Sequence, residues 1–223
     1  MNLALATGAL ASCAGTRAPP APPAADPSTA SFRADAGPMP VFRSRRFELS
    51  LPLPDGKTWR IDDHSQPELV ATHAPTRSRV TVAVFRANEL VGHARCEELA
   101  RERRLVPEAT DATNAATSAR VVEDEVTITQ DTFDTRIEVL VEPGAGPGGP
   151  LSGRVAAFGG FLRKCFVFVY TTSVDGSTDE PVLSDRLAFV RARVLGGLEL
   201  EPFDAVARSR GPADAAPRIA PGP

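Results

Sequence analysis

The stretch that most constrains the fold is the apolar run from Cys165 to Ser173, which reads CFVFVYTTS. It is rich in β-branched and aromatic residues, and it is too short to cross a membrane. The run therefore predicts a strand that is buried on both faces. A second strand is expected just before it, at Arg154–Phe161, and an amphipathic helix after it, from about Val182 to Leu195. Together these three elements predict the core of one domain.

The rest of the chain shows strand and helix patterns around this core. Alternating apolar residues predict strands at Phe47–Leu51, Lys57–Ile61, Leu69–His73, Arg79–Phe85, Arg120–Thr129 and Thr135–Val141. Because Pro54-Asp55-Gly56 is a turn signal, the first two of these strands should pair as a β-hairpin. An amphipathic helix is expected at about Gly92–Leu105. Strands and helices do not alternate regularly, so the sequence predicts an α+β domain with a mainly antiparallel sheet packed against two principal helices.

Composition divides the chain into a central domain and unusual ends. Residues 1–12 form a short apolar segment that we interpret as a lipoprotein signal segment. Residues 13–40 are rich in Ala and Pro and poor in large apolar side chains, which predicts an extended linker. The α+β domain should cover residues 41–203. The polar, Pro-rich end at 204–223 is expected to be a disordered tail.

The segment Leu10-Ala11-Ser12-Cys13 resembles the lipobox of bacterial lipoproteins, in which a Leu and two small residues precede the Cys that is lipidated. This resemblance implies lipidation at Cys13 and a protein held on a membrane of the cell envelope, facing the periplasm, with the outer membrane favoured over the inner. The linker that follows would hold the domain clear of the bilayer. The alternative is an Ala-rich amino terminus with an incidental Cys.

The two remaining cysteines, Cys96 and Cys165, allow two interpretations. The one we favour is a pair of buried free thiols, because small buried cysteines are common. The other is a disulfide, which an exported protein could form if the expected helix and strand brought the two together. No CxxC motif of the redox or zinc-binding type is present.

Charge and motifs exclude several function classes. The net charge is −3 and no basic stripe stands out, so we do not expect nucleic-acid binding. No motif of a hydrolase, a nucleotide-binding loop or a zinc protease occurs, and we expect neither catalytic residues nor a cofactor.

Three groups of residues offer weak alternatives to that expectation. A metal site could be formed by Asp62, His64 and His73, but loop polarity is favoured because structural zinc normally needs four close ligands. Glu123-Asp124-Glu125 could attract a cation, yet it is better interpreted as a solvated strand edge or turn. The glycines of 144–149 precede no helix, so they indicate a turn and not a phosphate site.

The order of elements resembles the PsbP-like fold. The resemblance starts with a strand running into Pro-Asp-Gly-x-x-Trp (Phe47–Trp59), followed by short strands, a helix, a strand meander and a last amphipathic helix. Extrinsic photosystem proteins, a Ran-binding nuclear protein and many bacterial lipoproteins share this fold. The resemblance implies a protein that works by binding other proteins and not by catalysis. No functional residue of the family matches a motif here.

These observations favour a non-catalytic, lipid-anchored envelope protein that binds a protein partner or supports an assembly. Its oligomeric state is not predicted. The alternative is a carrier of a small ligand in a cleft between sheet and helix, lined by Phe158, Phe161 and Trp59. The same aromatic residues could simply belong to the core. A closed core would favour the protein-binding function, and an apolar cavity of several hundred Å³ would favour the carrier, as in small-molecule sites of roughly 300–1,000 Å³.

Overall fold

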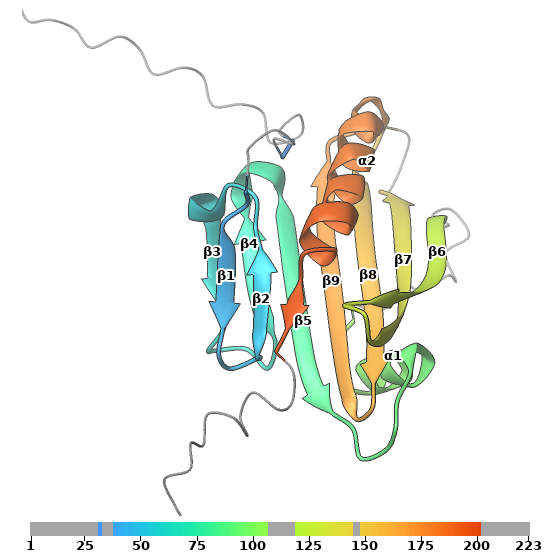
Figure 1. Cartoon of the computed structure of the whole chain (residues 1–223). Coiled ribbons are helices and arrows are strands. Elements are labelled where there is room, and N and C mark those ends of the chain that lie inside the picture. Colours follow the sequence, from blue (N-terminus) through green and yellow to red (C-terminus); the bar gives the residue numbers. More distant parts are fainter. Residues whose placement is uncertain (1–30, 33–37, 107–118, 145–147, 202–223) are drawn as a thin grey trace, which may run out of the picture.

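The computed structural model describes residues 31–32, 38–106, 119–144 and 148–201 (Figure 1). Its main elements follow the chain as β1 (Val41–Ser44), β2 (Leu49–Pro52), β3 (Trp59–Asp62), β4 (Leu69–His73), β5 (Ser78–Arg86), α1 (His93–Glu102), β6 (Arg120–Thr129), β7 (Phe133–Pro143), β8 (Leu151–Phe161), β9 (Lys164–Val174), α2 (Glu180–Phe189) and β10 (Glu199–Leu200). A π-helical segment, Val190–Leu195, continues α2. The predictions for residues 1–12, Cys13 and 204–223 lie outside the described residues.

The strands form two sheets, of seven and three strands. The larger has the order β3-β4-β5-β9-β8-β7-β6, and every neighbouring pair in it is antiparallel. Strand β9 therefore lies at its centre, with Phe168 opposite Val82 of β5 and Ala157 of β8. Its side chains are buried except for Thr171 and Ser173, which are partly buried. The predicted α+β fold, with a mainly antiparallel sheet and two helices, is confirmed.

The predicted hairpin of Phe47–Leu51 with Lys57–Ile61 is wrong. Strand β2 pairs with β1 and β10 in the smaller sheet, whereas β3 pairs with β4 in the larger one. The chain does turn at Pro54-Asp55-Gly56, as predicted. The turn continues as a 3-10 helix at Gly56–Thr58 and is closed by a hydrogen bond from Trp59 Nε1 to Pro54 O (2.6 Å), and the next strand then lies in the larger sheet. The short strands β1 and β10 were not predicted.

Helix α1 covers one face of the larger sheet, while α2 and the smaller sheet cover the other (Figure 1). The alternation of β9 explains this division, because successive side chains of a strand point to opposite faces. The large side chains of Phe166, Phe168 and Tyr170 join the cluster under α2 and the smaller sheet. The smaller side chains of Cys165 and Val167 face α1.

A residue of the predicted linker belongs to this core. Phe32 is 7% exposed and lies against Trp59, His73 and Phe189, with ring centroids 6.2, 5.6 and 5.5 Å away. Burying a Phe side chain stabilises a fold by roughly 1.5–3 kcal/mol. The folded domain therefore includes a residue that the sequence analysis assigned to the linker.

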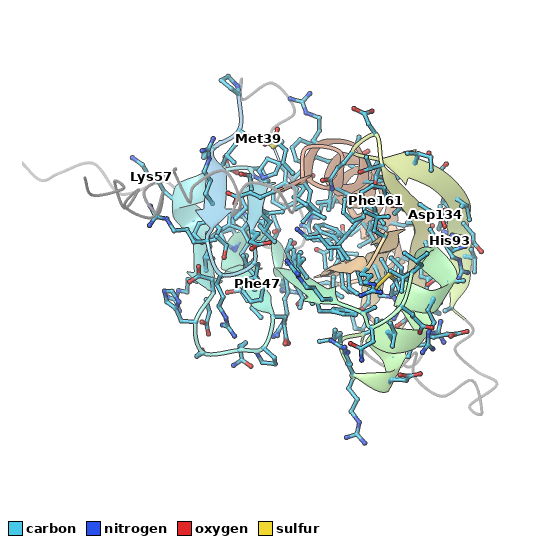
Figure 2. All side chains as sticks on the ribbon, turned by 60° about the horizontal axis from the view of Figure 1, so that its bottom comes forward. Met39, Phe47, Lys57, His93, Asp134 and Phe161 are labelled. Carbon is cyan, nitrogen blue, oxygen red and sulfur yellow. A yellow bond between two sulfur atoms is a disulfide. The ribbon has the colours of Figure 1, made fainter. Side chains whose placement is uncertain are left out.

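Helix α1 begins with a cap supplied by another strand. Its first residue follows Gly92, which has no side chain to cap the helix. The carboxylate of Asp134 on β7 accepts hydrogen bonds from the backbone N–H of His93 (3.1 Å) and lies 2.8 Å from His93 Nδ1 (Figure 2). An acceptor at a helix start satisfies one of the free backbone N–H groups. Asp134 thus fixes where α1 starts over the sheet.

Candidate functional site

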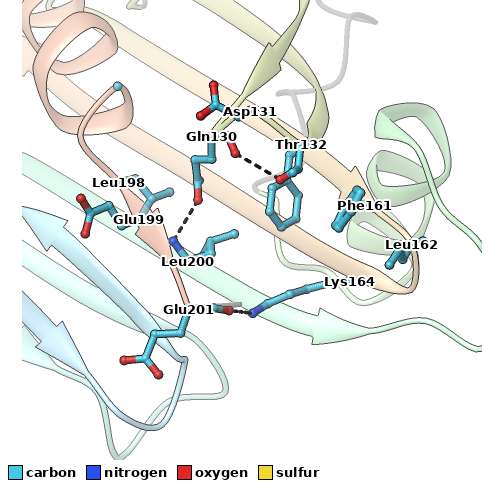
Figure 3. Close-up of a pocket in the computed structure, with 12 residues that line it drawn as sticks. Gln130, Asp131, Thr132, Phe161, Leu162, Lys164, Leu198, Glu199, Leu200 and Glu201 are labelled. Carbon is cyan, nitrogen blue, oxygen red and sulfur yellow. Dashed lines mark hydrogen bonds between the residues drawn. The ribbon is translucent and has the colours of Figure 1, made fainter. Parts of the chain in front are cut away.

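The described residues form a pocket of about 670 Å³ at one end of the two sheets (Figure 3). It lies where the β6–β7 turn, the β8–β9 turn and β10 come together. The lining residues are Gln130, Asp131, Thr132, Phe133, Phe161, Leu162, Lys164, Gly196, Leu198, Glu199, Leu200 and Glu201. The pocket is therefore built from the ends of strands and not from the space between α2 and the sheet.

The pocket has an apolar floor. Phe133 opens β7 and Phe161 closes β8, and their ring centroids lie 5.7 Å apart. Phe133 also meets Phe166 edge-on at 5.3 Å, which joins the floor to the core of the domain. Leu198 adds a fully buried aliphatic side chain. This floor can pack against an apolar ligand.

Two tight turns form the walls of the pocket, and both hold non-glycine residues at positive φ. These residues are Gln130 and Asp131 (φ 50° and 60°) and Leu162 (φ 53°). Such conformations are uncommon for side-chain-bearing residues. Gln130 Oε1 accepts a hydrogen bond from the backbone N–H of Leu200 (2.9 Å), which ties the β6–β7 turn to β10. Leu162 is left 55% exposed at the rim.

Lys164 separates this pocket from a smaller one of about 170 Å³ beside the β1–β2 turn. Its side chain is 3% exposed, and Nζ donates a hydrogen bond to Glu201 O (2.9 Å) and lies 3.6 Å from Glu48 Oε2. Burial lowers the pKa of the Lys164 ammonium, while the Glu48 carboxylate acts in the opposite direction. Lys164 therefore fastens the smaller sheet to β9.

The rim of the pocket is acidic. Asp131, Glu199 and Glu201 are exposed, and none of them forms a salt bridge within the part of the chain that the structure describes. The only cationic residue in the lining is Lys164, whose ammonium is held by Glu201 O and Glu48. The lining residues thus carry more negative than positive charge.

A second candidate surface is the outer edge of β6, the last strand of the larger sheet. Four aliphatic side chains of this strand are between 56% and 61% exposed: Val121, Val122, Val126 and Ile128. Large aliphatic residues on an edge strand, beside unpaired backbone groups, offer a template for a further strand. We define these four residues and the β6 backbone as the β6 edge.

The predicted acidic triplet lies on this strand, and its charges are paired. Asp124 forms a two-pronged interaction with Arg136 of β7, at 2.8 and 2.9 Å. Glu123 and Glu125 both pair with Arg191 beyond α2, the latter at 2.8 Å. Each carboxylate of the triplet thus has an arginine partner, and Arg191 is shared between two of them.

The residues of the conceivable metal site do not converge. Asp62 accepts hydrogen bonds from Ser65 and His64, and those from Ser65 contribute most to lowering the pKa of its carboxyl to about 2. His73 is buried elsewhere, with Nδ1 2.7 Å from Thr76 Oγ1. In the described ranges no group of three or more His, Cys, Asp or Glu side chains could hold a metal ion.

Cys96 and Cys165 are joined in the structure. Both residues are fully buried, their Cα atoms are 5.6 Å apart, and a disulfide links α1 to the central strand (Figure 2). The interpretation as two free thiols, which we favoured from the sequence, does not agree with this geometry. A packing argument could not have chosen between the alternatives, because both place the two residues at the same helix–sheet contact.

Of the three aromatic residues expected to line a cleft, only Phe161 lies at the pocket. Phe158 is 2% exposed on the opposite face, under α1. Trp59 stacks against His73, with ring centroids 5.0 Å apart, in the cluster that contains Phe32. Sequence reasoning missed Phe133 and the rim carboxylates, for which the only signal was polar turn residues beside aromatic ones.

A buried polar network was also missed. Arg186 of α2 is 1% exposed, and its Nη1 donates hydrogen bonds to Thr76 O and Ser173 O, both at 3.1 Å. Burial lowers the pKa of the Arg186 guanidinium. Nearby, Ser78 Oγ lies 2.9 Å from the hydroxyl of Tyr170. These contacts fix α2 over β9, so we assign them to the fold.

None of the helices in the described residues is long and apolar enough to span a bilayer.

Comparison with known proteins shows likeness in fold alone. No family model matches the chain, and no curated protein does. The solution structure of a cyanobacterial PsbP (CyanoP) from Synechocystis sp. PCC 6803 is similar with a TM-score of 0.44 and 10% identity, over 75% of this chain and 95% of that one. A crystal structure from Bacteroides thetaiotaomicron VPI-5482 gives a TM-score of 0.40 and 15% identity, over 73% of this chain and 48% of that one. The chain thus spans about half of the Bacteroides protein, and these likenesses carry no argument about function.

Proposed function

We propose that this chain is a non-catalytic, lipid-anchored protein of the cell envelope that binds an extended segment of another envelope protein along the β6 edge. The bound segment would add one strand to the larger sheet. In this mode of recognition, backbone hydrogen bonds supply affinity and alternate side chains supply specificity.

The exposure of the β6 edge carries the proposal. Val126 and Ile128 are 57% and 61% exposed on the same face of the strand. Natural sheets usually protect their edges with Lys, Pro or inward-pointing charges. β6 contains neither Lys nor Pro, and Asp124, on the same face as Val126, is paired with Arg136. Large apolar side chains on an unprotected edge are typical of an interaction surface.

The experiment compares complexes from the native envelope. We expect the wild-type chain, extracted in mild detergent, to migrate in a complex larger than the monomer. Val126→Lys with Ile128→Lys should release the monomer, because two ammonium groups would have to be buried against the partner strand. Both residues are exposed, so the fold should be unaffected. Leu90→Lys is the control, since Leu90 is 73% exposed and lies outside the edge. Monomeric wild type would overturn the proposal.

The anchor is a separate part of the proposal and rests on the lipobox resemblance at Cys13. Cys13→Ala should abolish lipid labelling and move the protein from the membrane to the soluble fraction. Equal and unlabelled behaviour of the two proteins would remove the anchor. It would leave the β6 edge to be tested by the complexes above.

A second candidate function, a small-ligand carrier, is supported by the pocket of about 670 Å³. Its volume lies within the range of roughly 300–1,000 Å³ that is usual for small-molecule sites. The pocket is not the cleft between sheet and helix that the sequence predicts. It uses Phe161 of the expected residues, together with Phe133 and Leu198.

A further inference from the structure

We infer that two copies of this chain pair through their β6 edges when no partner segment is bound there, as antiparallel strands centred on Thr127. The inference goes beyond the proposed function, because it names a second copy of the chain as an occupant of the same surface. An edge pairs with one strand at a time, so the second copy and the proposed partner segment would exclude each other. The self-pairing can be tested on the purified chain alone.

The outer edge of β6 is open to a second sheet. β6 is the last strand of the larger sheet and pairs with β7 (Figure 1). Helix α1 packs on β7, β8 and β9, and α2 packs on β8 and β9, so both helices lie inward of β6. Two β6 strands that paired across a twofold axis would join the two larger sheets into one antiparallel sheet. This pairing would supply partners for the outward-pointing backbone groups of both edges.

The sequence of β6 is symmetric about Thr127. From Glu125 to Thr129 it reads polar, aliphatic, Thr, aliphatic, polar. In an antiparallel pair centred on Thr127, the two copies of this residue lie opposite each other. Val126 of one copy then lies opposite Ile128 of the second copy, and Glu125 lies opposite Thr129. The strand therefore matches itself, as a twofold interface requires.

This register gathers exposed aliphatic side chains into one cluster. Val126 and Ile128 are 57% and 61% exposed, and they lie opposite Arg136 and Asp134 of β7. Because Asp134 caps α1, both aliphatic residues stand on the face of the sheet that carries α1. Directly opposite residues share a face, with Cβ atoms about 4.5–5.5 Å apart. Four aliphatic side chains, two from each copy, would thus be removed from water together.

The carboxylates of β6 favour this register over its neighbours. A pair centred on Thr127 places Glu125 opposite Thr129, where β6 ends. A pair centred one residue earlier would place Ile128 against Asp124 and lose an apolar contact. A pair centred on Glu125 or Asp124 would place a carboxylate opposite its own copy, and like charges directly opposite each other are destabilising. Charge and apolar pairing therefore select the same register.

The first test measures the oligomeric state of the purified full chain by sedimentation equilibrium. Every protein carries Cys13→Ala, so that a lipid anchor cannot add an association of its own. Because Cys96 and Cys165 are joined, this change also leaves the chain without a free thiol. We expect a dimer that dissociates on dilution. A chain that remains a monomer at about 100 μM would overturn the inference.

Charges placed at the centre of the pair test the register. Thr127→Glu and Thr127→Lys should each weaken dimerisation about fivefold or more, because two like charges would face each other across the axis. An equal mixture of the two variants should restore the dimer, since each carboxylate then lies opposite an ammonium group. This recovery also shows that both variants are folded. No gain on mixing would overturn the inference.

A cysteine at the same position gives an independent readout. Directly opposite residues of an antiparallel pair have Cα atoms about 4.5–5.5 Å apart, which a disulfide can span. Thr127→Cys should therefore form a covalent dimer on mild oxidation. Thr129→Cys is the matched control, because Thr129 lies on the same face of β6 but its two copies would be about 13 Å apart along the strand. Equal crosslinking of the two variants, or none in either, would overturn the inference.

The outcomes separate this inference from the proposed function. A monomeric purified chain would overturn the self-pairing and leave the β6 edge free for a segment of another protein, so the proposed function would stand. A dimer of the purified chain, together with no complex beyond that dimer in the native envelope, would support the self-pairing and overturn the proposed function.

Discussion

The two faces of the larger sheet are covered in different ways. On one face, α2, its π-helical continuation and the smaller sheet bury a broad apolar cluster around Phe166, Phe168 and Tyr170. On the other face, α1 packs through Ala100 on a smaller apolar cluster that includes Ala156 and Phe158. Here the helix is attached by a disulfide at Cys96, by the Asp134 cap and by a salt bridge between Glu97 and Arg136 at 2.8 Å.

The elements that cover the two faces are thus held in place by different interactions. A sheet face that carries large side chains is covered by burying area, which contributes roughly 25 cal/mol for each Å² of apolar surface removed from water. The face under α1 has a smaller apolar cluster to bury, and a covalent bond and polar contacts also hold its helix. We therefore expect variants on the two faces to fail in different ways.

The largest expected effect is on the face covered by α2. Leu183 is fully buried between α2 and the sheet, and Leu183→Ala should lower the free energy of unfolding by about 2–5 kcal/mol because it leaves a cavity. Denaturation in guanidinium chloride measures the loss. Leu90→Ala, at a residue 73% exposed, is the control and should cost little. A loss below about 1 kcal/mol for Leu183→Ala would mean that this face is not held by apolar packing.

Removing the disulfide tests the other face. Cys96→Ala with Cys165→Ala should lower the free energy of unfolding by about 2–4 kcal/mol, since the bond closes a loop between residues 69 positions apart. Hydrogen exchange should show α1 losing protection before α2. An identical unfolding midpoint with and without reductant would show that the bond does not hold α1 in the isolated protein.

A smaller effect is expected from the cap of α1. Asp134→Ala removes the acceptor for the His93 backbone N–H and should cost about 1 kcal/mol, as the loss of a helix cap does. Asp134→Asn retains an acceptor and should recover most of it. Thermal unfolding of the two variants makes the comparison. Equal losses would point to the carboxylate charge and not to the cap.

The smallest effect concerns the pH dependence of the face covered by α2. His73 is buried, and burial lowers the pKa of its imidazole below the ordinary value of 6.5. At a pH between the lowered pKa of the folded protein and 6.5, His73 binds a proton in the unfolded chain but not in the folded one. The free energy of unfolding should therefore fall as the pH is lowered through 6.5 toward the folded pKa. His73→Gln should remove this part of the slope. A wild-type slope equal to that of the variant would contradict the buried neutral histidine.

The sequence predicted the elements whose pattern is long and regular. Strand β9 and its neighbour β8 could be located because a continuous run of β-branched and aromatic residues needs burial on both faces. The two helices followed from apolar residues repeating at helical spacing. Both helices begin within two residues of the positions expected from the sequence.

The features that depend on distant contacts could not be predicted. Strand β10 has two residues, Glu199 and Leu200, and exists only because β2 lies beside it. The hairpin between β2 and β3 was wrongly predicted for a similar reason. A turn signal indicates that the chain changes direction, but it does not indicate which strand the next one pairs with. The pocket depends on β10 and on two turns far apart in the sequence, so no local pattern could indicate it.

The most direct test of the proposed function is photo-crosslinking in the cells that naturally produce the protein. A benzophenone-bearing amino acid replaces Val126 in one variant and Leu90, which is more exposed, in another. If the β6 edge receives a partner strand, ultraviolet light should give one discrete heavier product from position 126 and none from position 90. No product at 126, or the same products from both positions, would contradict the central claim that the β6 edge is a binding surface.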